Sequence, residues 1–153
     1  MLNQTDLEKI KKITEEFFQK MTFEVEIEIL PPKDLNLPIN LKLKEPQILI
    51  GEGGQTLLET QHLLKAILKK SISGPFFIDL DISGYKKKKI EYLKELAKNI
   101  ADEVALTKKE KSLAPMPAYE RRIVHLELAD RLDVTTESIG QEPERRVVIR
   151  PYP

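Results

Sequence analysis

The sequence lacks residues on which several common chemistries depend. Among its 153 residues there is no cysteine and no tryptophan, and there are only two histidines. Without cysteine the chain cannot form disulfides, thiolate metal sites or cysteine nucleophiles. The two histidines, His62 and His125, lie too far apart in the sequence to make a recognisable metal site. We therefore expect neither a bound metal nor a cofactor.

A net charge and long apolar segments are missing as well. The 25 lysines and arginines balance 25 aspartates and glutamates, so no overall field attracts a nucleic acid or a membrane. The charge is unevenly distributed, because residues 1–83 hold 13 acidic and 10 basic side chains while residues 84–153 hold 12 and 15. No segment approaches the ~18 apolar residues of a membrane span, and the N-terminus has no leader pattern. We expect a soluble, intracellular protein that does not insert into membranes.

Hydrophobic periodicity predicts an α+β protein. Apolar residues make up 41% of the chain, which is enough for the core of one compact domain or two small ones. Helical spacing and strict alternation predict, in chain order, a helix over 5–21, strands over 23–29 and 39–44, a helix after Gly54, a strand over 76–82, a long helix from about 86, a helix near 118–131, and strands over 134–139 and 145–150.

Two local patterns refine this prediction. Thr5 and Glu8 have the spacing of a capping box at the start of the first helix. The strands over 23–29 and 39–44 alternate glutamates or lysines with apolar residues. Opposite charges on neighbouring strands stabilise antiparallel pairs, so we expect these two strands to form a hairpin in which glutamates face lysines.

The most informative local motif is Gly51-Glu52-Gly53-Gly54, which follows a short apolar segment and precedes a helix. Glycine lets the backbone bend sharply and approach a ligand, and the free N–H groups of the following helix attract anions. The motif lacks the Gly-Lys-Ser/Thr ending of a nucleotide-binding P-loop and the spacing of a dinucleotide fingerprint. A phosphate is therefore the expected ligand, and a tight strand-to-helix turn without a ligand is the alternative.

The order of elements around this loop resembles a KH domain of the bacterial Jag (SpoIIIJ-associated) family, also called KhpB or EloR. The stretch Ile48-Leu49-Ile50-Gly51-Glu52-Gly53-Gly54-Gln55-Thr56-Leu57 carries the resemblance. In KH domains such a loop clamps the backbone of about four nucleotides. The resemblance implies that the loop contacts nucleic acid and that Ile48 and Ile50 line an apolar groove beside the bases. Family members commonly have a basic residue in the loop, where Glu52 instead opposes a phosphate.

A second motif pairs a permanent cation with a titratable one. Arg121 and His125 are four residues apart on a predicted helix, so their side chains are neighbours on one face. Together they can hold one phosphate, because arginine offers a fork of donors and histidine donates from a ring nitrogen. The alternative is a partly buried His125 bonded to a main-chain carbonyl, since apolar residues lie nearby on the same helix.

The sequence around this pair resembles the R-three-H motif, named for its Arg-x-x-x-His core, at the C-terminus of Jag-like proteins. The resemblance begins at Pro115-Met116-Pro117-Ala118-Tyr119-Glu120-Arg121-Arg122-Ile123-Val124-His125 and continues through residues 135–140 and 144–149. It implies binding of single-stranded nucleic acid, with Arg121 and His125 as exposed contacts. Pro117-Ala118 stands where the family usually has Asn-Pro at the helix start.

Other basic residues extend the predicted contact surface. The long helix opens with consecutive lysines, and the last predicted strand carries two arginines on one face. These residues are Lys86, Lys87, Lys88, Lys89, Arg146 and Arg150. Lysines at a helix start face the positive end of the helix dipole, and a bound polyanion would offset that repulsion. The alternative is a solvated surface. Tyr85 and Tyr119 precede basic residues, where their rings can stack on bases or pack in a core.

These features together predict two modules. A KH-like (type II-like) domain covers residues 1–83, and an R-three-H domain covers residues 84–153, including the long helix that joins the two. The resemblance implies a cytoplasmic bacterial regulator that binds single-stranded RNA, or DNA, and is linked to cell elongation or sporulation. It also implies pairing with a small stand-alone KH protein, and it is compatible with a homodimer.

Two other classes of function remain open. One is a protein-interaction adaptor whose KH-like module, disabled by Glu52, serves as a dimer surface and binds little nucleic acid. The other is a nuclease or another phosphate-processing enzyme. The sequence shows no nucleophile beside a base and no Ser-His-Asp arrangement, so we expect no catalytic residue and no enzyme.

Overall fold

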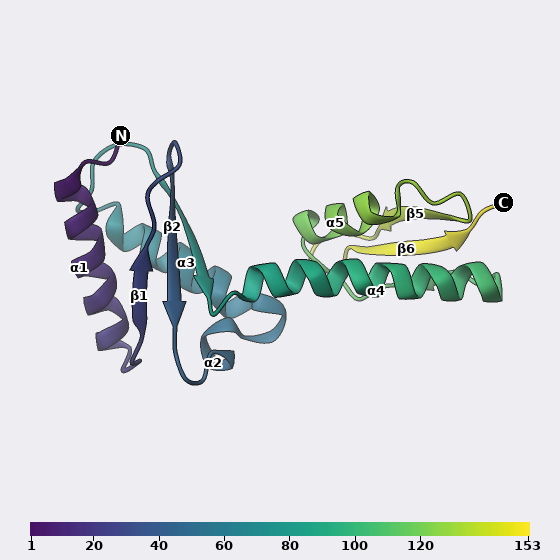
Figure 1. Ribbon diagram of the computed structural model, residues 1–153, viewed down its shortest axis with the longest axis horizontal. Helices are drawn as coiled ribbons and strands as arrows, with labels where there is room; N and C mark the ends of the chain where they lie inside the picture. Colours follow the sequence, from purple (N-terminus) through teal and green to yellow (C-terminus); the bar gives the residue numbers. More distant parts are fainter. The chain divides into compact units, whose positions relative to one another are not determined.

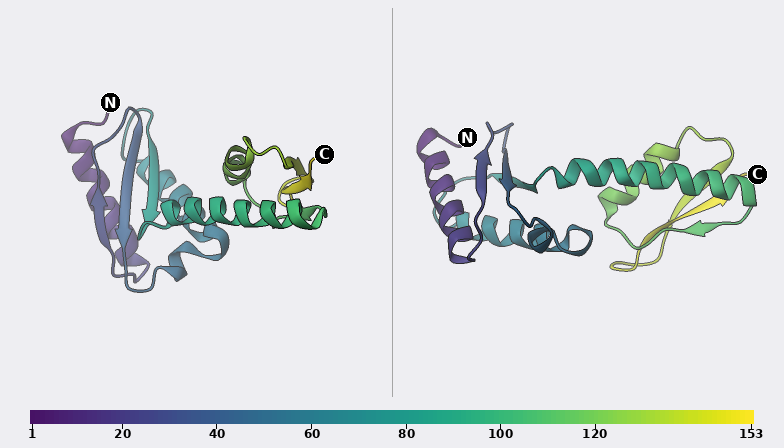
Figure 2. Two further views of the ribbon diagram at one scale, coloured as in Figure 1. Left: turned by 45° about the vertical axis from the view of Figure 1, so that its right-hand side comes forward. Right: turned by 60° about the horizontal axis from the view of Figure 1, so that its bottom comes forward.

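The computed structural model describes residues 1–153, which form two compact units, Met1–Lys86 and Lys87–Pro153 (Figures 1 and 2). Each unit combines helices with a three-stranded sheet. The predicted α+β class is therefore confirmed. None of the helices is both long enough and apolar enough to cross a membrane.

The first unit contains one sheet and the helices that cover it. Its elements are α1 (Gln4–Lys20), β1 (Glu26–Ile29), β2 (Asn36–Lys42), α2 (Gln47–Ile50), the short 3-10 turn η1 (Glu52–Gly54), α3 (Gln55–Leu68) and β3 (Phe77–Ile82). The strand order is β1-β2-β3, with β1 antiparallel to β2 and β2 parallel to β3. The parallel pair requires a crossover connection, which α2 and α3 provide.

A reciprocal capping box starts α1, although two residues earlier than predicted. The Asp6 amide donates to Asn3 Oδ1 over 2.8 Å, and the Asn3 amide donates to Asp6 Oδ2 over 3.1 Å. The predicted box at Thr5 and Glu8 is therefore wrong. Asn and Asp satisfy the same spacing, and asparagine is at least as good an N-cap as threonine.

The predicted hairpin of β1 and β2 is confirmed, but its charge pairing is only partly as expected. Glu26 lies opposite Lys42, whereas Glu28 lies opposite Asn40. Glu24 precedes β1 and Lys44 follows β2, so neither is in the ladder. The second strand starts earlier than predicted, at Asn36, because β3 pairs with its first residues.

The core of the first unit lies between one face of the sheet and the helices α1 and α3. Alternate residues of β2 and β3 are buried in register, so that one face of the sheet is apolar along its length. The fully buried large side chains of this core include Ile10, Phe18, Leu37, Ile39, Leu41, Leu64, Leu68, Phe76, Leu80 and Ile82. Since both helices pack on this face, the opposite face carries polar residues such as Asp79 and Asp81.

The second unit contains a small antiparallel sheet and two helices. Its elements are α4 (Tyr85–Thr107), which starts in the last two residues of the first unit, β4 (Lys111–Ser112), α5 (Ala118–Leu128), β5 (Val134–Ile139) and β6 (Arg146–Pro151). The strand order is β4-β6-β5. The two predicted C-terminal strands are confirmed, and β4 was not predicted because two residues show no periodicity.

A separate apolar core holds the second unit together. It joins one face of α4, the inner face of α5 and the central strand β6. Its most buried members are Ala97, Ala101, Val104, Val124, Val147 and Ile149. The register places Thr136 opposite Ile149 and Ser138 opposite Val147. Thr136 and Ser138 therefore lie on the sheet face that packs against the helices.

Candidate nucleic-acid interface

The glycine loop Gly51–Gly54 joins helix α2 to helix α3. Residues 47–50 form a helix, so the turn connects two helices and not a strand and a helix. Gly51, Gly53 and Gly54 have φ angles of 73°, 61° and 84°, in the left-handed region that favours glycine. A Cβ on Gly51 would come within 2.1 Å of Thr56 Oγ1, and a Cβ on Gly54 would lie 3.0 Å from the Tyr85 ring. The loop conformation thus depends on glycine at two positions, whereas space around Gly53 is open.

The start of α3 directly behind this loop has the properties of an anion site. Its N-cap is Gly54, which provides no side-chain cap, and its first turn contains no acidic residue. The first N–H groups of the helix are therefore not used by a capping side chain, and the helix dipole places positive potential there. Glu52 and Gly53 are exposed, so the loop is accessible. The Glu52 carboxylate is the one group in the loop that opposes an anion.

Ile48 and Ile50, which precede the loop on α2, differ in exposure. Ile48 is 58% exposed, whereas Ile50 is 4% exposed and belongs to the core of the first unit. Residues two apart on a helix point in different directions, so both cannot face one groove. The expectation that Ile50 lines a groove beside the bases is therefore wrong, and of the two residues only Ile48 is exposed.

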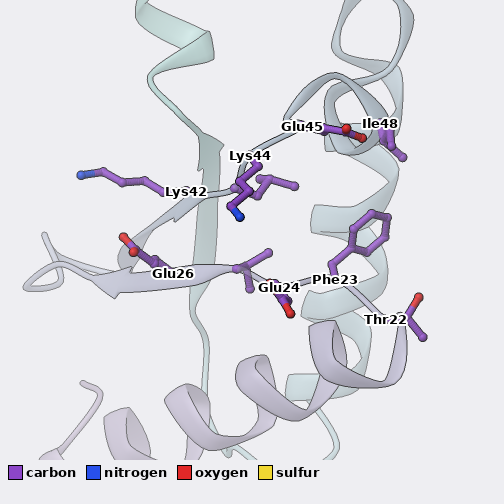
Figure 3. A pocket seen from close by; sticks show the side chains of 10 residues that line it. Thr22, Phe23, Glu24, Glu26, Lys42, Lys44, Glu45 and Ile48 are labelled. Atoms are coloured by element: carbon purple, nitrogen blue, oxygen red, sulfur yellow. The ribbon is translucent and has the colours of Figure 1, made fainter.

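Ile48 lines an open groove of about 580 Å³ in the first unit (Figure 3). The other lining residues come from the segment before and within β1 and from the end of β2. They are Thr22, Phe23, Glu24, Val25, Glu26, Lys42, Leu43, Lys44 and Glu45. Figure 3 shows the Phe23 ring extending toward Ile48. The groove thus has an apolar wall and a rim that mixes both signs of charge, so its electrostatics do not favour a phosphate.

The lysines at the start of α4 are partly neutralised by carboxylates of β3. Lys86 Nζ forms an ion pair with Asp79, and the Lys86 amide donates to Asp81 Oδ1 over 3.1 Å. Asp81 therefore offsets the repulsion between the lysines and the helix dipole without any polyanion. Lys87 and Lys88 are exposed and form no ion pair. Of the predicted lysine cluster, these two remain the most available to a ligand.

Arg121 is buried, contrary to the expectation of an exposed contact. Its side chain lies at the start of α5, and the residue is only 7% exposed. Nη1 donates to the Met116 carbonyl over 2.8 Å and to Glu142 Oε1 over 2.7 Å. The guanidinium thus connects the segment before α5 to the turn between β5 and β6. Both protons of Nη1 are used within the protein, and the burial of the side chain limits the access of a phosphate to the guanidinium.

The His125 ring is half-buried, and both of its nitrogens have partners on β5. Nδ1 lies 2.7 Å from Thr136 Oγ1, and Nε2 lies 2.7 Å from Ser138 Oγ. Burial, and then the positive charge of Arg121, lower the pKa of His125. The expectation that His125 is an exposed donor to a phosphate is therefore wrong. The alternative of a partly buried His125 is right about its burial, but the partners are two hydroxyl groups and not a main-chain carbonyl.

Arg146 and Arg150 on β6 are paired with carboxylates. Arg146 lies 3.5 Å from a Glu144 carboxylate oxygen. Arg150 Nε donates to Glu110 over 2.9 Å, and Arg150 Nη1 forms a second ion pair with Glu137. These partners raise the pKa of Arg150. The side chains are partly exposed, and the neighbouring carboxylates offset part of their positive charge.

One exposed cation, Arg122, was not among the contact residues predicted from the sequence. Arg122 lies next to Arg121 on α5, is exposed, and forms no hydrogen bond or ion pair. The available signal was its spacing of three residues from Tyr119, which places the two side chains on one face of the helix. The Arg-x-x-x-His pattern directs attention to Arg121, although the neighbouring arginine is the accessible one.

Comparison with known proteins identifies a matching domain family and similar bacterial proteins. Residues 91–151 match the R-three-H domain family. The chain is 40% identical over 145 residues to RNA-binding protein KhpB of Clostridium symbiosum, which covers 93% of this chain and 64% of that protein. It is 35% identical over 111 residues to the protein of the same name from Lactiplantibacillus plantarum, with 72% and 34% covered, and 36% identical over 104 residues to that from Bacillus subtilis, with 67% and 50% covered.

The chain thus spans between 34% and 64% of the length of these curated relatives. The shared name of these relatives describes RNA binding. The second unit contains the whole matched segment. The chain therefore contains an R-three-H domain and has homologues among the bacterial proteins named RNA-binding protein KhpB.

Proposed function

We propose that this protein is a non-enzymatic regulator that binds single-stranded RNA. In this proposal the first unit is a KH-like, type II-like module, the second is the R-three-H module, and α4 joins them. The observation that carries the proposal is the exposed glycine loop in front of the uncapped start of α3. A sugar-phosphate backbone is the ligand that such a loop fits best, because backbone N–H groups recognise phosphates without reading the bases.

The element order of the first unit supports the KH-like assignment. A helix, two strands, a helix, the glycine loop, a helix and a third strand follow one another, with the loop between two helices. This is the arrangement in which a GXXG loop clamps about four backbone nucleotides. The names of the curated relatives support RNA over DNA as the natural ligand.

The proposal extends to location and partners. We infer a cytoplasmic protein whose first unit pairs with a small stand-alone KH protein or with a second copy. Light scattering of the full chain, alone and with such a protein, tests this pairing. The rival reading, an adaptor with little RNA affinity, makes the opposite prediction for RNA binding, and it is an outcome of the experiment below.

Gly53→Asp in the loop tests the proposal most directly. No atom lies within 4 Å of a Cβ at Gly53, and aspartate tolerates a positive φ better than most residues, so the fold should persist. The new carboxylate would stand beside the phosphate path. We expect the affinity for a labelled single-stranded RNA, measured by fluorescence anisotropy, to fall about tenfold.

Gly74→Asp is the matched control. Gly74 also has a positive φ, at 90°, and open space around its Cβ position, but it lies in the turn before β3. We expect this variant to bind RNA as the unchanged protein does. Equal affinities for both variants, with both folded, would contradict the loop as the binding site. An unchanged protein without salt-sensitive RNA binding would favour the adaptor, and metal-dependent RNA cleavage would favour an enzyme.

A further inference from the structure

Arg122 is the only arginine whose guanidinium has no partner within the protein. The other arginines donate to carboxylates or to main-chain carbonyls. They are Arg121, Arg131, Arg145, Arg146 and Arg150. Guanidinium groups that lie near carboxylates are readily neutralised by ion pairs, as four of the six arginines here are. An exposed arginine without any partner is therefore available to an anionic ligand.

The surroundings of Arg122 form an exposed face of α5. Tyr119 precedes it by three residues and Leu126 follows it by four, a spacing that places all three on one side of the helix. Tyr119 is 59% exposed and Leu126 is 64% exposed. The opposite side of α5 is buried through Val124 and Leu128. We call the three exposed residues, Tyr119, Arg122 and Leu126, the outer α5 face.

No carboxylate on α5 neutralises this face. The helix neighbours of Arg122 at three and four residues are Ala118, Tyr119, His125 and Leu126. Of the helix's acidic residues, Glu120 is buried and Glu127 is paired with Lys98 over 2.9 Å. His125 adds no charge near neutral pH, because its pKa is lowered. The face thus combines one free cation, one aromatic ring and one apolar side chain.

This combination matches the chemistry of a single-stranded nucleic acid. A guanidinium binds a phosphate through parallel hydrogen bonds, and an exposed aromatic ring offers a stacking surface for a base. The Tyr119 hydroxyl donates to Glu120 Oε1 over 3.2 Å, which restricts where the ring can lie. Adjacent positions on a helix keep ring and cation within reach of the same nucleotide step.

We propose that the outer α5 face is the nucleic-acid contact of the second unit, with Arg122 on a phosphate and Tyr119 stacked on a base. The proposal rests on the proposed RNA-binding function and specifies which residues of the second unit perform it. Arg121 and His125 are then positioning residues, because their bonds to Met116, Glu142 and β5 hold α5 in place.

Arg122→Ala in the full chain tests the proposal, with Lys109→Ala as the matched control. Lys109 is exposed in the same unit and forms no ion pair, so both substitutions remove one positive charge. The probe is a labelled single-stranded RNA of about 16 nucleotides, titrated at several salt concentrations. We expect Arg122→Ala to weaken binding about fivefold at low salt and to reduce the salt slope by about 0.7, the value for one lost phosphate contact. Lys109→Ala should leave that slope nearly unchanged.

Substitutions of Tyr119 test the stacking contact separately. Tyr119→Phe keeps the ring and removes the hydroxyl that donates to Glu120, so RNA affinity should stay near that of the unchanged protein. Tyr119→Leu removes the ring, and we expect affinity to fall about fivefold, within the range measured for base stacking on aromatic residues. Equal effects of the two substitutions would overturn the assignment of Tyr119.

The outcomes separate this proposal from the function on which it rests. If Gly53→Asp weakens RNA binding while Arg122→Ala behaves like Lys109→Ala, the outer α5 face is not an RNA contact but the protein still binds RNA. If the unchanged protein does not bind RNA, both proposals fail. Unchanged RNA binding by Arg122→Ala, together with lost binding of labelled polyglutamate, would assign the face to an acidic protein partner and overturn the proposal.

Discussion

The His125 imidazole lies between two hydroxyl groups that can each donate or accept. A neutral ring needs one donor and one acceptor, and Thr136 and Ser138 supply both at 2.7 Å. A protonated ring would need both hydroxyls to accept and would lie near the Arg121 charge. Burial and this charge explain why the pKa of His125 is lowered from 6.5. The side chain therefore joins α5 to β5 in its neutral form.

This geometry predicts how stability changes with pH. Because the pKa of His125 is lower in the folded protein, the unfolded chain takes up the proton first as the pH falls below 6.5. Proton uptake then favours unfolding. We expect the free energy of unfolding, measured with urea at about pH 7.5 and about pH 5.5, to fall more in the unchanged protein than in His125→Gln.

His62→Gln is the control for this measurement. His62 is exposed on α3, and its replacement leaves the contacts of His125 with β5 intact. We expect it to retain the pH dependence of the unchanged protein. An equally steep loss of stability in His125→Gln would show that the bonds to Thr136 and Ser138 do not favour the neutral ring.

The packing of α5 depends on Arg121, which links two segments that are distant in sequence. The Met116 carbonyl lies before the helix, and Glu142 lies in the turn between β5 and β6. We expect Arg121→Met to lower the free energy of unfolding by about 2 kcal/mol, because the buried carbonyl loses its donor and the ion pair is lost. The stability of Arg122→Ala should change by less than about 0.5 kcal/mol, since that side chain contacts no partner.

RNA binding distinguishes this positioning role from a direct contact. If Arg121 only holds α5 in place, folded Arg121→Met should keep the salt slope of RNA binding, even where its affinity is reduced. A slope lowered as in Arg122→Ala would identify Arg121 as a phosphate contact and contradict its burial. Denaturation with urea, run on both variants and on the unchanged protein, supplies the folded fraction that this comparison needs.

Long periodic elements were predictable from the sequence, and short or non-local features were not. The helices α1, α3, α4 and α5 and the strands β5 and β6 follow from spacing alone. The elements α2 and β4 did not, because four and two residues are too few to show a period. The burial of Arg121 was not predictable from the sequence either. It depends on Glu142, which lies 21 residues away and is brought close only by the β5–β6 turn.

In the candidate site, too, local features were predictable from the sequence and non-local features were not. The glycine loop is a local motif, and its exposure and positive φ angles agree with what four consecutive residues indicated. The charges of Arg146, Arg150 and Lys86 could not be judged from composition, because their carboxylate partners come from other elements or from the turn before β6. The sequence places Arg122 on one face of the helix with Tyr119, but that Arg122 is unpaired is known only after each other arginine has been matched to its partner.

At the scale of the whole molecule, the glycine loop and the outer α5 face belong to one chain. The two proposals together therefore predict how RNA affinity depends on RNA length. A strand of about four nucleotides fills the glycine loop alone, whereas one of about 16 nucleotides has length to spare for a second contact. If one strand contacts both the loop and the outer α5 face, the second contact forms at a raised effective concentration. Affinity should therefore rise with RNA length by more than the number of binding positions explains.

Arg122→Ala separates these two contributions. Extra binding positions on a longer strand increase affinity equally in the unchanged protein and in the variant, whereas the second contact increases it only in the unchanged protein. We expect Arg122→Ala to bind the short RNA normally and the long RNA about fivefold more weakly. Gly53→Asp should bind both RNAs more weakly. An identical gain with length in the unchanged protein and Arg122→Ala, measured by anisotropy at one salt concentration, would mean that only one unit holds the strand.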